Sequence, residues 1–453
     1  MIETPEATQP SATATQEGDS PETKPTQEDH TNEQLQEKRL LGRRQWFYRI
    51  SFAILTTVFA LLVAENVVAG VAPQPVAYST PQLNRGAFTT PGKYRHSTDE
   101  FDVVVNVNRH GFVDREWNAR WMDQKRILLL GDSFVQAAQV DLDKGLGRQL
   151  EKTLQQMSIE SEVLSLGVPG AGTATQLLLL QKYVDELEPD EVILCFLVAN
   201  DVLNNHPSLE LKTDKPFLVP DPTNPDKLTI FQSNAPADKN WLWDNSHLSR
   251  WMTRRLQFQE MVRQKTEQGD GVPIDYHVHN DQLDPTWEEA WQLTNHITSE
   301  MAALLKQKSI DFRIVLIPAL EQINKKSALE IKQAYSETIR WDFVTYAQRR
   351  ALATMSQYGP VLNLQDSLSM HPNPETLYYL KDRHWTEEGH ATAAKILAGW
   401  LSHDPYDAVT DPRPPPKPIG DEITSDQLYK EATRKDTPES TQNPSEFEIQ
   451  KWN

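Results

Sequence analysis

The stretch Ile127-Leu128-Leu129-Leu130-Gly131-Asp132-Ser133-Phe134 joins a run of apolar side chains to a small polar turn. A short apolar run of this kind is typical of a strand buried on both faces of a sheet, and Gly-Asp-Ser predicts a tight turn where that strand ends. A serine on such a turn lies at the edge of the sheet, where its hydroxyl is accessible. Taken alone, the fragment also fits a plain turn in which Ser or Asp caps a helix, so other residues must decide.

The pattern on both sides of this stretch alternates apolar runs with amphipathic segments. Such alternation is typical of an α/β fold, in which five strands and the helices between them form a parallel sheet covered on both faces. In parallel sheets, ligands collect at the carboxyl ends of the strands. The expected strands span residues 126–130, 162–166, 191–197, 312–317 and 361–364, and the expected helices lie near residues 144–157, 175–187, 287–307, 343–358 and 387–401.

Polar residues follow the first three expected strands, because Ser133, Gly170 and Asn200 each come just after one of them. A serine hydroxyl is a poor nucleophile at neutral pH, so it requires a base and a third group that orients the base. His384 is the candidate base, and Asp382 can accept a hydrogen bond from the other N–H of the ring. The backbone N–H groups of Ser133 and Gly170 and the Asn200 side-chain amide are candidate donors to the oxyanion of an acyl-transfer reaction.

Each of these fragments alone also fits a turn, a helix start or a surface loop, but their order along the chain resembles a known family. The blocks at residues 131–134, 167–173, 199–201 and 382–384 closely resemble the four motif blocks of the SGNH (GDSL-type) hydrolase superfamily, which carry Ser, Gly, Asn and His. The resemblance spans roughly residues 105–402. It implies a flavodoxin-like three-layer α/β/α domain, an ester-cleaving or acyl-transferring activity, and no metal or organic cofactor.

The same resemblance implies a role for each matched residue. Ser133 is the expected nucleophile, His384 the base and Asp382 its partner. Gly170 and Asn200 are expected to complete the oxyanion hole together with the Ser133 N–H.

Two positions depart from the motifs of the family. Val198 stands where the third block usually has glycine, and Lys381 stands where the last block usually has its acid, which leaves Asp382 one residue closer to the histidine. The shorter Asp-x-His-Trp spacing, which ends at Trp385, is similar to that of SGNH-like O-acetyltransferases acting on exported polysaccharides. The role of Asp382 is therefore the part of the predicted site that most needs a structural test.

The composition excludes some classes of partner. A formal charge of −19 and the lack of a basic stripe argue against nucleic acid, whose phosphates attract clustered Lys and Arg. Cys195 is the single cysteine, so no intrachain disulfide is possible, and its apolar surroundings in sequence predict a buried, unreactive thiol.

An apolar segment from Trp46 to Ala64 is close to the ~20 residues that a membrane-spanning helix requires. Basic residues precede or open this segment, so the positive-inside rule predicts a single-pass membrane protein with a cytoplasmic N-terminus and a catalytic domain in the periplasm or outside the cell. A cleaved signal peptide and a buried soluble helix are the alternatives. The basic residues are Lys38, Arg39, Arg43, Arg44 and Arg49.

The domain organisation follows from these features and from the polar, Pro-rich ends of the chain. The expected parts are a disordered cytoplasmic tail (1–45), a transmembrane helix (46–65), a linker and lead-in (66–104), an SGNH hydrolase-like domain (105–403) with an insert (202–286), and a Pro-rich disordered tail (404–453).

The function expected from the sequence is that of a membrane-anchored serine esterase that hydrolyses carboxylic esters. The expected substrate is an acylated carbohydrate or a small ester, with acetyl as one candidate acyl group. Two alternatives remain open at this point, an O-acyltransferase acting on an exported carbohydrate and a catalytically inactive envelope protein that serves as a binding or scaffold module.

Overall fold

A computed structural model describes residues 27–74, 90–118, 120, 124–210, 215–232, 241–256, 272–280, 284–335 and 346–403. The predicted disordered tail over residues 404–453, and residues 1–26 of the predicted N-terminal tail, lie outside this range. The chain divides into two compact units, Met1–Asn66 and Val67–Asn453. The sheet and all candidate site residues belong to the second unit.

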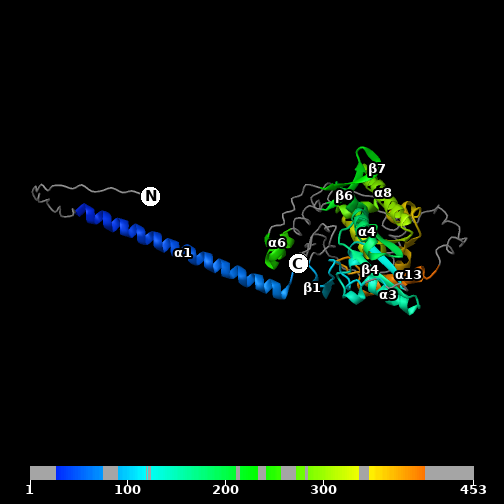
Figure 1. The fold of residues 1–453 in the computed structure, drawn as a ribbon, viewed down its shortest axis with the longest axis horizontal. Coiled ribbons are helices and arrows are strands. Elements are labelled where there is room, and N and C mark those ends of the chain that lie inside the picture. The colour runs from blue at the N-terminus through cyan, green and yellow to red at the C-terminus, as the bar shows by residue number, and fades with distance from the viewer. Residues whose placement is uncertain are drawn as a thin grey trace, which may run out of the picture. The chain divides into compact units, whose positions relative to one another are not determined.

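A five-stranded sheet with the strand order β4-β3-β5-β8-β9 forms the centre of the second unit (Figure 1). All four neighbouring pairs are parallel, which confirms the α/β fold with a five-stranded parallel sheet. The chain goes from β3 to β4 on one side and then to β5 on the other, so β3 lies where the strand order reverses. Ligands bind at such a switch point. The strands are β3 (Lys125–Gly131), β4 (Ser161–Gly167), β5 (Glu191–Leu197), β8 (Asp311–Ile317) and β9 (Val361–Asn363).

Helices cover both faces of the sheet, which gives three layers. Along β3 the side chains alternate, so that Leu128 and Leu130 enter one hydrophobic cluster while Ile127 and Leu129 enter the other. The first cluster packs under α4 (Thr173–Leu187), α8 (Pro285–Gln307) and α11 (Tyr346–Met355), and the second under α3 (Leu146–Gln156), α12 (Leu364–Ser369) and α13 (Glu387–Leu401). In Figure 1, α3 and α13 lie together on one side of the sheet, opposite α4 and α8.

Cys195 lies in β5 and is fully buried, as its sequence context predicts. Burial raises the pKa of its thiol far above the ordinary value, so the reactive thiolate is not formed at neutral pH.

The lead-in forms a separate antiparallel hairpin of β1 (Gly92–Ser97) and β2 (Asp102–Val107). Beyond the hairpin, Asp114 accepts a hydrogen bond at 2.9 Å from the backbone N–H of Ser165 in the edge strand β4, so this part of the chain packs on the edge of the sheet. The hairpin turn instead packs near the loop before α13, where Phe101 lies 5.1 Å from the ring of Tyr379.

The insert after β5 contains a second antiparallel hairpin, β6 (Pro216–Asp221) with β7 (Asn224–Gln232). The described residues of this unit also form several short elements. They are α2 (Ser133–Gln136), η1 (Leu142–Lys144), α5 (Asp201–Asn205), α6 (Trp241–Asn245), η2 (Ile274–His279), α9 (Leu320–Ile323), α10 (Lys325–Ala334) and η3 (Pro374–Thr376).

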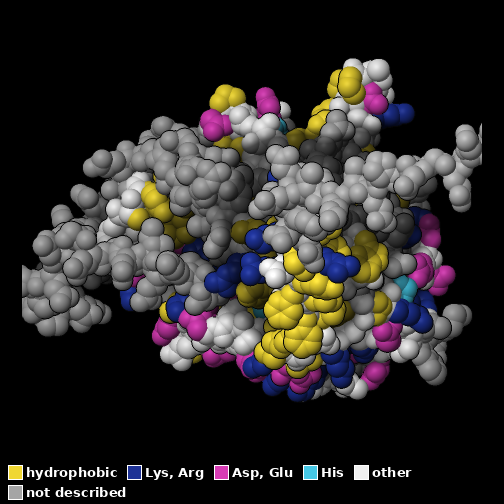
Figure 2. Space-filling view, turned by 90° about the vertical axis from the view of Figure 1, so that its left-hand side faces the viewer, with side chains coloured by type: hydrophobic (Ala, Val, Ile, Leu, Met, Phe, Trp, Pro, Cys, Tyr) yellow, Lys and Arg dark blue, Asp and Glu magenta, His cyan; other side chains and the backbone are white. Residues whose placement is uncertain are grey.

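The N-terminal helix α1 (Gln27–Val71) contains the predicted apolar segment. Among the described residues it is the one helix long and apolar enough to cross a membrane, over Lys38–Val71, and none of its apolar window is buried in the protein. This exposure is consistent with a membrane span or with a signal sequence. Figure 2 shows one face of the molecule, on which hydrophobic side chains gather into a patch with Lys and Arg side chains beside it.

One part of the predicted tail over residues 1–45 is wrong in the structure, because α1 already begins at Gln27. The reason is local: between Gln34 and Arg44 the chain is rich in Leu, Gln, Glu, Lys and Arg, which all have high helix propensity. A helix that starts in the apolar segment therefore continues toward the N-terminus.

Candidate active site

The predicted nucleophile Ser133 is the first residue of α2 and comes two residues after Gly131, where β3 ends. Asp132 caps this short helix, because its side chain accepts a hydrogen bond at 2.9 Å from the Phe134 N–H. The end of β4 passes very close to α2, since a Cβ on Gly167 would lie 2.1 Å from the backbone nitrogen of Gln136. The glycine at this position therefore lets the strand edge hold α2 and its serine in place.

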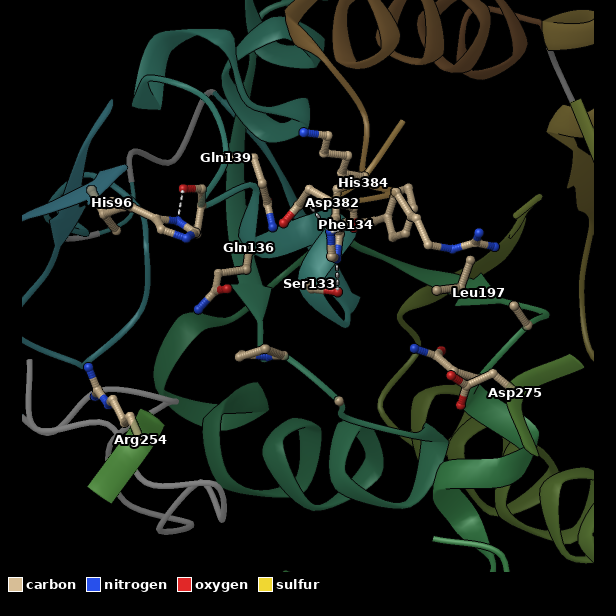
Figure 3. Close-up of a pocket in the computed structure, with 18 of the residues that line it drawn as sticks. His96, Ser133, Phe134, Gln136, Gln139, Leu197, Arg254, Asp275, Asp382 and His384 are labelled. Atoms are coloured by element: carbon tan, nitrogen blue, oxygen red, sulfur yellow. Dashed lines mark hydrogen bonds and ion pairs between the residues drawn. The ribbon is translucent and has the colours of Figure 1, made fainter. Parts of the chain in front are cut away.

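The predicted base and its partner lie beside this serine (Figure 3). His384 Nε2 is 2.7 Å from Ser133 Oγ, and His384 Nδ1 is 2.7 Å from Asp382 Oδ1. The loop that carries both residues is followed by α13, and the Thr386 hydroxyl caps that helix by accepting a hydrogen bond from the Gly389 N–H at 3.2 Å. Ser133 and His384 are 251 positions apart in the chain, and the structure joins them with Asp382 in one hydrogen-bonded line.

Aromatic packing fixes the orientation of the imidazole. The ring of Phe134 lies 5.1 Å from the ring of His384 and 4.9 Å from that of Trp385, centroid to centroid. Trp385 is fully buried and forms an isolated β-bridge with Tyr378, so the loop is anchored on the side away from the cavity. Buried aromatic contacts of this geometry limit the rotation of the histidine ring.

The predicted oxyanion-hole residues line the same cavity as Ser133 and His384, which has a volume of about 1330 Å³. Gly170 has a φ of 70°, a conformation that glycine adopts without strain, and its carbonyl accepts a hydrogen bond at 3.0 Å from Lys215. The Asn200 side-chain amide donates to Asp132 Oδ2 at 3.4 Å, a long contact that leaves the amide weakly held. The role of Gly170 and Asn200 as oxyanion donors stays a prediction.

Two buried carboxyl groups beneath the site were missed by sequence reasoning. Asp132 and Asp201 are both completely buried. Burial raises the pKa of Asp132 above its ordinary value, although the Phe134 N–H and His384 work against this rise. Burial, and then the charge of Asp132, raise the pKa of Asp201 well above its ordinary value, so the pair resists carrying two negative charges. Each aspartate adjoins a predicted site residue in sequence, which was the available signal.

Arg383, which lies between Asp382 and His384, has a φ of 72°. A left-handed backbone costs a residue with a Cβ roughly 1 kcal/mol, so the loop is locally strained. The guanidinium of Arg383 pairs with the buried carboxylate of Glu321 in α9. Burial works to raise the pKa of Glu321, but Arg383 and then His279 outweigh it and hold the pKa at about 2. Glu321 follows the end of β8, so a search for polar residues after every strand would have found it.

Among the described residues, no group of three or more His, Cys, Asp and Glu side chains is arranged to hold a metal ion.

A serine, a histidine and an aspartate joined at the carboxyl edge of a parallel sheet form the arrangement that serine hydrolases use. No protein-family profile and no curated protein matches the chain. Solved structures with similar folds include a lipase/acylhydrolase from Enterococcus faecalis, which is 14% identical with a TM-score of 0.32, over 61% of this chain and 95% of that one.

Two further structures have a comparable similarity. A GDSL-like lipase from Bacteroides thetaiotaomicron is 12% identical with a TM-score of 0.31, over 63% of this chain and 92% of that one. AlinE4, an SGNH-hydrolase family esterase, is 13% identical with a TM-score of 0.29, over 62% of this chain and 97% of that one. Likeness at this level leaves the function to be inferred from the site itself.

Proposed function

We propose that this chain is a serine esterase of the SGNH (GDSL) type that hydrolyses carboxylic esters. The observation that carries the proposal is the line of two 2.7 Å contacts from Ser133 Oγ through His384 to Asp382. A cavity of about 1330 Å³ opens onto this line, so an ester carbonyl has access to the hydroxyl. The nucleophile, the base and the orienting carboxylate are the three groups that acyl transfer through serine requires.

In the proposed reaction, Ser133 Oγ attacks the ester carbonyl while His384 Nε2 takes the hydroxyl proton. The Asp382 carboxylate holds the Nδ1–H and stabilises the imidazolium that forms. Collapse of the tetrahedral intermediate breaks the bond to the alcohol, which leaves with the proton from His384. His384 then takes a proton from water while the water oxygen attacks the acyl-serine carbonyl. As the bond from the acyl carbon to Ser133 Oγ breaks, His384 returns that proton to Oγ, and the carboxylic acid is released.

The negative oxygen of the intermediate is stabilised by the backbone N–H groups of Ser133 and Gly170 and by the Asn200 side-chain amide. All three residues line the same cavity, which supports this assignment. The weak 3.4 Å contact of the Asn200 amide with Asp132 supports it as well, because such an amide can turn toward a stronger acceptor.

Acyl transfer to a sugar hydroxyl, in place of hydrolysis, is the second candidate function. The volume of the cavity, about 1330 Å³, supports it, because it leaves room for a carbohydrate acceptor beside an acyl donor. The catalytic residues are the same in both reactions. Acetyl release measured with and without an oligosaccharide acceptor separates them, since transfer yields acetylated acceptor and faster turnover.

The proposed location is a membrane, with α1 as a single-pass anchor, the N-terminus in the cytoplasm and the catalytic unit outside it. Support comes from the exposed apolar span of α1 and from the five basic residues that precede or open its apolar part. Labelling of single introduced cysteines in right-side-out vesicles, with a maleimide that cannot cross membranes, tests this orientation. The native Cys195 is buried and so should not react. Met370→Cys should be labelled and Thr8→Cys should not; labelling only Thr8→Cys contradicts the orientation.

Hydrolysis of 4-nitrophenyl acetate by the full chain in detergent tests the proposed activity. Ser133→Ala and His384→Ala should abolish turnover without unfolding the protein. Ser97→Ala is the matched control, because Ser97 lines the same cavity and contacts neither His384 nor Asp382 in any described hydrogen bond. Turnover that survives Ser133→Ala contradicts the mechanism, and a folded wild-type chain without turnover on any of a panel of esters supports an inactive binding module.

A further inference from the structure

Only one residue separates Asp382 from His384, and their side chains must nevertheless come into contact. Two residues of extended chain advance roughly 6.6 Å, which separates side chains at alternate positions. Here the carboxylate and the imidazole are in contact at 2.7 Å, and the residue between them, Arg383, has a φ of 72°. The left-handed turn at Arg383 brings the side chains of Asp382 and His384 together, so that an acid only two positions before the base can contact it. Such a turn persists only where neighbouring groups hold it.

The first of these groups is Glu321. Its side chain is 2% exposed and pairs with the Arg383 guanidinium, whose carbon also lies 5.5 Å from the ring of Tyr276. His279 Nε2 lies 3.4 Å from the other carboxylate oxygen of Glu321, so both oxygens have a cationic or polar neighbour. Glu321 follows β8 in the rigid sheet, and the Arg383 side chain therefore ties the loop to that sheet.

The second group is Glu100, in the turn of the β1–β2 hairpin. Its Oε2 accepts a hydrogen bond from the backbone N–H of Asp382 at 2.7 Å, and its Oε1 accepts one from the N–H of Lys381 at 3.0 Å. Phe101, next in sequence, packs on Tyr379 at 5.1 Å between ring centres. A carboxylate from the lead-in thus holds the backbone of the residue that orients the base.

We infer that Glu100 and Glu321 are positioning residues, which hold the Asp382-Arg383-His384 turn from two sides in the conformation that joins Asp382 to His384. The inference rests on the proposed function, because it assigns these carboxylates to the geometry of that reaction. It also gives the lead-in hairpin a part in catalysis, since Glu100 lies outside the sheet and its helices.

Four variants of the full chain test this inference: Glu100→Gln, Glu321→Gln, Arg383→Met and Arg383→Lys. A misplacement of about 1 Å at a reacting group costs on the order of 100-fold. Glu100→Gln, Glu321→Gln and Arg383→Met should each lower kcat by about 10- to 100-fold for 4-nitrophenyl acetate, with KM within about twofold of wild type. Arg383→Lys keeps a cation for Glu321 and should recover most of the kcat that Arg383→Met loses.

Asp99→Asn is the matched control. Asp99 is the neighbour of Glu100 and pairs with the Lys381 side chain on the surface, without a described contact to the backbone of the turn. Its kcat should stay within about twofold of wild type, as expected for an exposed pair.

Three outcomes overturn the inference while wild-type turnover still supports the esterase. The first is a kcat of wild-type size in Glu100→Gln and Glu321→Gln. The second is a loss that matches the loss of folded protein by circular dichroism, with normal kcat per folded molecule, which means a structural role only. The third is an equal loss in Arg383→Lys and Arg383→Met. If the wild type itself fails to turn over esters or to react at Ser133, the proposed function fails instead.

Discussion

Gly167→Ala should displace the nucleophile without touching any group that takes part in the chemistry. A Cβ at this position would lie 2.1 Å from the backbone nitrogen of Gln136 and 2.6 Å from the carbonyl carbon of Val135. Ordinary contact begins at 3.4 Å, so β4 and α2 must separate by more than 1 Å. These neighbours are backbone atoms and cannot rotate away, and α2 begins with Ser133. The strain should destabilise the fold by about 1–3 kcal/mol.

The catalytic effect should exceed the effect on folding, because a shift of about 1 Å at the nucleophile costs on the order of 100-fold in kcat. Thermal unfolding and 4-nitrophenyl acetate turnover, measured on the same preparation, separate the two effects. Gly399→Ala is the matched control: nothing lies within 4 Å of a Cβ there, and Gly399 lies inside α13, so alanine should stabilise the helix by about 0.5–1 kcal/mol and leave kcat unchanged. A Gly167→Ala protein with native Tm and native kcat refutes the proposed link between strand packing and the nucleophile.

Three other predictions concern the oxyanion hole and two buried ionisable groups. Asn200→Ala should lower kcat by about 100-fold or more with little change in Tm, and near-native turnover removes Asn200 from the oxyanion hole. The pKa of Glu321 is about 2, below its ordinary value of 4.5, so the stability that this carboxylate contributes is full above pH 4.5 and is lost as the pH falls toward 2. In denaturant unfolding, the difference in unfolding free energy between wild type and Glu321→Gln should therefore shrink from pH 4.5 to pH 2, and a constant difference contradicts the ion pair. Burial, and then His384, lower the pKa of His390 to about 3 from its ordinary value of 6.5. Below pH 6.5 the folded state therefore binds fewer protons than the unfolded state, and the stability should fall as the pH drops. In His390→Leu this slope should flatten, which the same unfolding series checks, and an unchanged slope means that other groups cause it.

The strands and their parallel arrangement could be predicted from the sequence because each buried strand is an apolar run between amphipathic helices. The five predicted strands agree with the observed ones to within two residues at each end. The strand order was beyond this reasoning, because it depends on pairings between distant segments, such as β5 with β8, which are separated by the whole insert. Local periodicity carries no information on such pairings.

The core of the candidate site was also predictable, since Ser133, His384 and Asp382 are residue types that acyl transfer requires. The departure at Lys381 placed Asp382 in question, and the structure shows why the shorter spacing permits contact. Arg383 supplies the left-handed turn that no sequence pattern announced, because a positive φ at arginine depends on its surroundings.

Glu100 could not have been found by inspection of the chain. It is separated from Asp382 by 282 positions and lies in a hairpin turn whose sequence has no catalytic signature. Its contact exists because the lead-in folds back onto the loop before α13. The start of α1 at Gln27 was missed for a different reason: a polar composition suggested disorder, whereas helix propensity and the adjoining apolar segment favoured a helix.

The proposed reaction depends on His384 activating the Ser133 hydroxyl. The most direct measurement is the reaction of the full chain with a fluorophosphonate, followed by mass mapping of the modified peptide. We expect one adduct, on Ser133. It should form at a normal rate in Ser97→Ala, be lost in Ser133→Ala and form much more slowly in His384→Ala. An adduct on a different residue, or labelling of Ser133 at the same rate without His384, contradicts it.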